Sequence, residues 1–142
     1  MAGIGYGAAF WLGNAATPSV LTELAEVFAL APPNAQTADV ETTHYKSPAR
    51  TREYIAGLTD AGETDVQMNY APGSATDLLI TAAKLSGDVR PYKIELLDAE
   101  GEIWEITGEC YVKGYAKEIP VDDRMTATMT IRFSGASEEA SA

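Results

Sequence analysis

The sequence is poor in the residues that most catalytic and metal sites use. Among 142 residues there is one cysteine, Cys110, and one histidine, His44. Cys110 has no partner for an intramolecular disulfide, and its alternating surroundings predict a small buried hydrophobe. A single histidine without cysteines at ligand spacing gives no zinc signature. We therefore predict no catalytic residue, no metal site and no cofactor, and we interpret His44 as a solvated or structural side chain.

Basic residues and long apolar runs are scarce as well. The chain has 10 Lys and Arg residues against 21 Asp and Glu residues, a formal net charge of −11. This charge repels a phosphate backbone on average, which argues against nucleic-acid binding by bulk attraction. The apolar run at residues 8–12 is far shorter than the about 20 residues of a membrane-spanning helix. No basic residue precedes it, so we expect neither signal peptide nor membrane anchor.

What the sequence does contain is a long alternation of apolar and polar residues near its C-terminus. Residues 104–117 and 125–133 alternate with a period of two, and a turn at 120–123 separates them. This pattern predicts a long antiparallel hairpin of half-buried strands. A strand at 92–96 and the turn after it extend the hairpin into a meander. We predict further strands at 8–12, 39–43 and 65–70, in one domain of residues 1–135.

One segment predicts a helix. Ser74 is a candidate N-cap, Asp77 stands three residues on, and Gly87 is a candidate stop. An apolar stripe inside it, made of Leu78, Ala82 and Leu85, is expected to cover one face of the sheet. Residues 20–30 fit either a helix or a strand, and the pattern leaves both readings open.

Residues 43–64 form an unusually long connection between two expected strands. An ordered connection of this length is uncommon, and where one occurs it most often has a functional or docking role. Self-association would account for it, because apolar side chains could bury against a neighbouring copy while arginines meet that copy's acidic surface. The alternative is that the connection folds back on its own domain. The candidate contact residues are Tyr45, Arg50, Arg52, Tyr54, Ile55 and Leu58.

An ordered series of segments between about Leu24 and Gly135 resembles one family. The series includes "DVETTHYKSP", "REYIAGLTDAGE", "TDLLITAAKLSGDVRPYKIEL" and "WEITGECYVKGYAKEIPVDDRMTATMTIRFSG". Together these resemble the major tail tube proteins of long, flexible-tailed (siphovirus-type) bacteriophages. The resemblance implies a mainly β fold, an antiparallel β-sandwich or barrel-like domain with one flanking α-helix. It also favours strand over helix at residues 20–30.

The resemblance further implies a virion structural protein that self-assembles into stacked hexameric rings, the tail tube through which DNA leaves the head. Expected partners are other copies of the chain, the tape measure protein and the tail terminator and distal tail proteins. Assembly is expected in the host cytoplasm. Residues 43–64 would be the stacking loop, residues 1–16 a flexible N-terminal arm and residues 136–142 a disordered tail.

A conduit for DNA should lack exposed cations that would bind phosphate. The polar side of the long hairpin would suit such a lining, whereas Lys113, Lys117 and Arg132 would need acidic partners or an outward position. The candidate lumen residues are Glu105, Thr107, Glu109, Thr126, Thr128 and Thr130. The sequence leaves open which face of the sheet looks into the bore.

Two other functions remain open at this point. One is the tube protein of a contractile tail or a type VI secretion-like injection machine, which shares the implied fold. The other, from a different class, is a carbohydrate-binding β-sandwich that uses Trp11, Trp104 or surface tyrosines.

Overall fold

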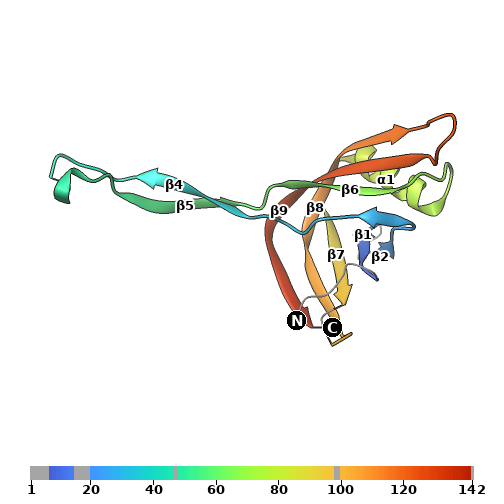
Figure 1. Ribbon diagram of the computed structural model, residues 1–142, viewed down its shortest axis with the longest axis horizontal. Coiled ribbons are helices and arrows are strands. Elements are labelled where there is room, and N and C mark those ends of the chain that lie inside the picture. The colour runs from blue at the N-terminus through green and yellow to red at the C-terminus, as the bar shows by residue number, and fades with distance from the viewer. Residues whose placement is uncertain (1–6, 15–19, 47, 98–99, 142) are drawn as a thin grey trace.

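The central element of the computed structural model is a seven-stranded antiparallel sheet in the order β2-β1-β7-β8-β9-β6-β3 (Figure 1). The structure describes residues 7–14, 20–46, 48–97 and 100–141. The elements are β1 (Ala9–Gly13), β2 (Leu21–Glu23), β3 (Val27–Ala29), β4 (Gln36–Glu41), a 3-10 turn (Pro48–Arg50), β5 (Tyr54–Asp60), β6 (Glu63–Asn69), α1 (Ala75–Ser86), β7 (Arg90–Leu97), β8 (Ile103–Glu118) and β9 (Thr126–Ser141).

The hairpin predicted near the C-terminus is confirmed as β8 and β9. Its pairing runs from Glu118 opposite Thr126 to Trp104 opposite Ser141. The expectation of a disordered tail at 136–142 is therefore wrong for residues 136–141. Their side chains are small or polar, but a strand needs only a partner for its backbone groups, and the first half of β8 supplies one. Residue 142 lies outside the described residues.

Alternation predicts the buried side of β8 correctly from Ile106 to Val112, whereas Trp104, assigned to the same side, is exposed. Ile106, Cys110 and Val112 are buried, as expected. A register irregularity between Val112 and Gly114 then adds one residue to β8. Beyond it Tyr115, opposite buried Met129, takes the inward position that the sequence pattern assigned to Gly114.

The sheet curls until its two ends meet at the turn between β2 and β3. The amide of Leu24 donates to the carbonyl of Phe10 in β1 at 2.9 Å, and the amide of Asn69 in β6 donates to the carbonyl of Glu26 at 3.1 Å. Residues 20–30 are thus two short strands with a turn between them, so the strand reading favoured by the resemblance is correct. The expectation of a flexible arm over residues 1–16 is wrong for Ala9–Gly13, which form β1 and pair with β7. Residues 1–6 and 15–16 lie outside the described residues.

The hydrophobic core fills the inside of this curled sheet. Phe10 stacks on Tyr92 with ring centroids 6.0 Å apart, and Tyr92 lies 5.1 Å from Phe133. Cys110 is fully buried, which confirms its predicted role as a small hydrophobe. The remaining buried apolar residues are Leu12, Leu24, Val66, Met68, Ile80, Ala83, Ile94, Ile106, Val112, Ala127, Met129 and Ile131.

Both predicted ends of α1 are confirmed, but the predicted buried face is wrong. The Ser74 side chain accepts from the amide of Asp77 at 3.2 Å, and Gly87 ends the helix in the left-handed conformation at φ 67°. Ile80 and Ala83 face the core, whereas the stripe of Leu78, Ala82 and Leu85 is exposed. Two hydrogen bonds fix this rotation: the amide of Ala25 donates to Thr76 Oγ1 at 2.9 Å, and the Tyr115 hydroxyl donates to Asp77 Oδ1 at 3.0 Å.

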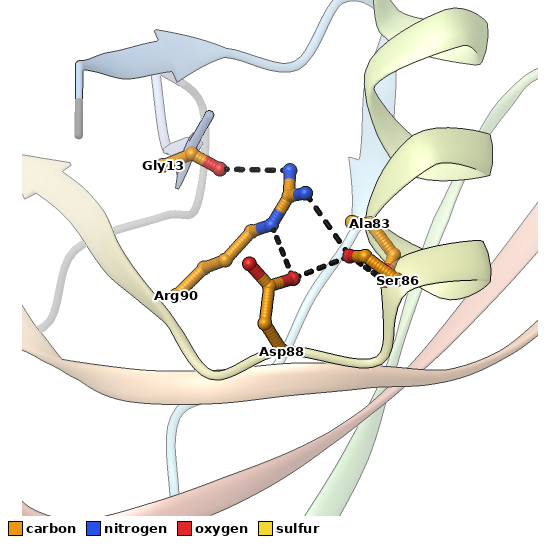
Figure 2. Close-up of polar contacts among 5 residues, drawn as sticks. All are labelled: Gly13, Ala83, Ser86, Asp88 and Arg90. Carbon is orange, nitrogen blue, oxygen red and sulfur yellow. Dashed lines mark hydrogen bonds and ion pairs between the residues drawn. The ribbon is translucent and has the colours of Figure 1, made fainter. Parts of the chain in front are cut away.

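A buried arginine fastens the C-terminal end of α1 to the sheet (Figure 2). Arg90 is 3% exposed, and its guanidinium donates to Asp88 Oδ1 at 3.0 Å, to Ser86 Oγ at 3.2 Å and to the Gly13 carbonyl at 3.4 Å. The Ser86 hydroxyl also hydrogen-bonds to Asp88. These contacts satisfy a charge that would otherwise be costly to bury, and they join α1, β7 and β1.

Candidate functional site

A two-stranded hairpin of β4 and β5 projects away from the sheet (Figure 1). We call residues 36–60 the arm. Every residue of β4 is exposed, and Gly57 is the only residue of β5 that is not. An isolated two-stranded hairpin is marginally stable in water. The arm therefore has the character of an element that completes its packing against another surface.

The arm corrects the expectation of a continuous loop at residues 43–64. Tyr54–Asp60 form β5, and Glu63 and Thr64 already belong to β6. The strand was missed because it is exposed on both faces and so carries no apolar–polar alternation. The register also shifts between Thr37 and Asp39.

The six predicted contact residues all lie on the arm, but they do not form one patch. Ile55 pairs with Val40 on one face of the hairpin, while Tyr54 pairs with Glu41 on the other. Leu58, which is 90% exposed, lies at the register shift opposite Ala38, so alternation from Tyr54 does not place the two side chains on one face. Tyr45, Arg50 and Arg52 lie in the tip between the strands.

The arm's tip has an unusual backbone. Ala49 and Arg50 both adopt φ 56°, the left-handed region that non-glycine residues rarely occupy. Such residues cost about 1–3 kcal/mol each unless their surroundings stabilise them. Across the base of the tip, His44 Nε2 lies 3.5 Å from Glu53 Oε2, and the Glu53 amide donates to Thr43 Oγ1 at 2.7 Å.

The predicted lumen residues share the face of the sheet that points away from the core. We call this side the polar face. Glu109 lies opposite Pro91 and Ser134, while Thr130 lies opposite Asp65. The two sets are nevertheless separate along the hairpin. Glu105, Thr107 and Glu109 lie toward the end of β9, whereas Thr126, Thr128 and Thr130 lie toward its start.

Three cations also reach the polar face, and each contacts a carboxylate. Lys113 Nζ lies 2.7 Å from Glu63 Oε2, and Arg132 Nη2 lies 2.7 Å from Asp60 Oδ2. Lys93 Nζ lies 2.9 Å from Glu95 Oε1 and 3.7 Å from Glu105 Oε1. The requirement that Lys113 and Arg132 find acidic partners is thus met.

These ion pairs shift the pKa values of the groups involved. The hydrogen bond from Lys113 lowers the pKa of Glu63. The backbone amide of Gly62, and then Arg132, lower the pKa of Asp60. The hydrogen bond to Glu95 raises the pKa of Lys93. The carboxylates of Asp60 and Glu63 are therefore ionised near neutral pH.

Lys117, which the sequence analysis considered together with Lys113 and Arg132, does not lie on the polar face but on the opposite face of the sheet. Its ammonium stands 5.2 Å from the centroid of the Tyr70 ring and 5.0 Å from that of Tyr115. Lys93 and the acidic partners Asp60 and Glu63 were not identified from the sequence. The contacts of Asp60 and Glu63 join segments that are distant along the chain, and no local pattern predicts such pairs.

The described part of the chain lacks two features that would indicate other classes of site. It contains no group of three or more His, Cys, Asp or Glu side chains placed to hold a metal ion. No helix in the same described part is long and apolar enough to cross a membrane.

The fold of this chain is similar to that of several solved tail and injection-system proteins. The tail of an empty gene transfer agent particle, refined with C6 symmetry, is similar at a TM-score of 0.76 and 15% identity, covering 98% of this chain and 99% of the other. The SPP1 tail tube is similar at 0.62 and 10% identity, covering 98% and 79%. A terminator of an extracellular contractile injection system is similar at 0.69 and 11% identity, covering 99% and 97%.

A family assignment follows from the sequence itself. Residues 6–140 match the model of the lambda phage tail tube protein family, so the chain belongs to that family. It is a structural protein of a virion tail tube. No curated protein matches the sequence significantly. The fold and the family predicted from the sequence are therefore confirmed.

Proposed function

We propose that this chain forms hexameric rings that stack into a tail tube, and that the tube conducts DNA out of the particle. The observation that carries the proposal is the arm, an exposed hairpin with apolar side chains on both faces. The C6 symmetry of the similar gene transfer agent tail supports six copies in a ring. The candidate contact residues Tyr45, Arg50, Arg52, Tyr54, Ile55 and Leu58 would then bury against neighbouring copies.

The polar face is the proposed lining of the bore. It carries the carboxylates of Glu105 and Glu109 and the hydroxyls of Thr126, Thr128 and Thr130, and its cations are paired. Such a surface repels phosphate and gives DNA few places to bind. The role is structural rather than enzymatic, in keeping with the family.

Electron microscopy of the concentrated protein tests the proposal. We expect tubes with an axial channel and six-fold end views, with the polar face toward the channel. A protein that stays monomeric at every concentration and salt condition would contradict the assembly, and tubes with another face inside would contradict the lining.

A contractile system is the second candidate, because two proteins of an extracellular contractile injection system share the fold at TM-scores of 0.69 and 0.63. The two candidates differ in one component, since a contractile tail carries a sheath around its tube. A native particle with a bare tube would support the flexible-tailed system. The comparisons give no support to carbohydrate binding.

The remaining partners follow from the proposed tube. A tape measure protein would occupy its lumen, and terminator and distal tail proteins would bind its two ends. The tube would assemble in the host cytoplasm. Antibody labelling of tail ends in the native particle checks the end partners.

A further inference from the structure

The cations of the polar face share a feature that stability alone does not explain. Lys93, Lys113 and Arg132 each have a carboxylate within 3 Å. The pairs Lys113–Glu63 and Arg132–Asp60 are between about a third and two thirds exposed. Ion pairs with that exposure contribute little to folding, because water and salt screen them. Their regular presence on one face points to a different use.

The placement of the acidic partners supports this view. Glu63 and Asp60 lie at the junction of the arm and β6, while Lys113 and Arg132 come from β8 and β9. The cations therefore receive their partners from a different part of the chain. Other carboxylates of the polar face, such as Glu109 and Glu118, have no cation opposite them in the register.

A free lysine or arginine facing DNA would bind a phosphate and release a counterion. Each such contact makes the slope of the logarithm of the binding constant against the logarithm of the salt concentration more negative by about 0.9. A cation already hydrogen-bonded to a carboxylate has little net charge to offer and a donor that is already used. The pair as a whole is close to neutral toward a passing polyanion.

We propose that Glu63 and Asp60 act as shields that keep Lys113 and Arg132 from binding DNA phosphates. This inference rests on the proposed function, because it concerns the same face of the same tube. It assigns these two carboxylates a role in letting DNA slide. The role differs from that of carboxylates such as Glu109, which add negative charge without covering a cation.

The test compares two double variants of the soluble chain. D60N/E63Q releases both cations, whereas E109Q/E118Q makes the same change in charge on the same face and releases none. Binding of a short DNA duplex is measured by fluorescence anisotropy at increasing NaCl. We expect D60N/E63Q to bind at least tenfold more tightly than the control at low salt. The slope of log binding constant against log salt concentration should be more negative for D60N/E63Q than for the control by about 1.8, because two cations are released.

A rescue variant separates shielding from a change of fold. D60N/E63Q/K113Q/R132Q removes the released cations, and its DNA binding should return to the level of wild type. Thermal unfolding confirms that each variant is folded. Equal DNA binding by D60N/E63Q and E109Q/E118Q would overturn the inference. Failure of the wild-type chain to form tubes would instead contradict the proposed function, and the duplex measurement on soluble protein does not depend on tubes.

Discussion

At the scale of the residue, two glycines of β8 differ in what surrounds them. A Cβ on Gly108 would lie 2.9 Å from the hydroxyl oxygen and 3.0 Å from Cε1 of Tyr92, whose ring is buried in the core. A Cβ on Gly114 would meet only Thr130, at 3.8 Å, an ordinary contact. Gly108 is thus a position where the strand makes room for a core aromatic.

We predict that Gly108→Ala lowers the free energy of unfolding by about 1–3 kcal/mol, because a packed tyrosine has to move. Gly114→Ala is the matched control, on the same strand and with the same added methyl group. We expect it to change stability by less than about 1 kcal/mol. Urea denaturation followed by fluorescence measures both values. Equal losses in the two variants would show that the Tyr92 contact is not the cause.

Cys110 gives a second prediction at this scale. Burial raises the pKa of its thiol to about 12 from a reference value of 9.0. Because the folded value is the higher one, the thiol stabilises the fold below pH 9.0, and this contribution is lost as the pH rises toward about 12. A thiol reagent at about pH 8 should leave the native chain unlabelled and label it fully in urea. Rapid labelling of the native chain would contradict this burial.

Residue-scale features that depend on neighbours in sequence could be predicted, and those that depend on distant strands could not. The Ser74 cap and the Gly87 stop follow from side-chain and backbone chemistry within one turn. The buried side of α1 instead depends on Tyr115 and Ala25, which lie far away in the chain. Leu78 and Leu85 were assigned to the core because the sequence does not show which side meets the sheet.

At the scale of the element, the arm is the least supported part of the described chain. Its strands pair only with each other in the sheet topology, and Leu58, Ile55 and Tyr54 are all more than half exposed. Few buried apolar contacts and an exposed backbone are the marks of a segment that opens easily. We expect its amides to exchange with solvent faster than those of β8.

A substitution in the arm should separate folding from assembly. We predict that Leu58→Asp or Tyr54→Asp leaves the monomer folded, because neither side chain is buried in it, and blocks tube growth by placing a charge in an apolar contact. Electron microscopy and thermal unfolding measure the two effects. Val121→Asp, at a fully exposed position in the β8–β9 turn, is the control. Normal tubes from the Leu58 and Tyr54 variants would remove these side chains from the assembly contact.

The elements differed in how far the sequence could predict them. Strands with one solvent-exposed and one buried face, such as β6 to β9, can be predicted because burial of one face imposes an apolar–polar alternation with a period of two residues. The pairing of residues 136–141 came from backbone hydrogen bonds, which leave no pattern in the side chains. For the same reason, the sequence pattern does not predict β5 in the arm.

At the scale of the whole molecule, three carboxylates form ion pairs at separate places in the structure. Asp60 contacts Arg132 at the base of the arm, Glu63 contacts Lys113 across the sheet, and Asp88 contacts Arg90 beside α1. Hydrogen bonds lower the pKa of each one, for Asp88 chiefly those from Ser86 and Arg90. All three therefore make the fold depend on pH in the same direction.

We predict that the free energy of unfolding falls as the pH drops below the unfolded values of 3.8 for Asp and 4.5 for Glu. A lowered pKa means that the stabilisation is present above those values and is lost as the pH falls through the folded ones. Urea midpoints at a series of acidic pH values measure the effect. The D60N/E63Q/D88N variant should show a flatter curve, and an unchanged slope would exclude these groups.

In the proposed tube, the arm of one copy would contact a different surface on a neighbouring copy. A contact between unlike surfaces does not close on itself in a pair, so each added layer presents the same unfilled surface as the one before. Growth would then have a direction but no natural end. The chain itself would then not determine the length of the tail, and a separate component would have to set it.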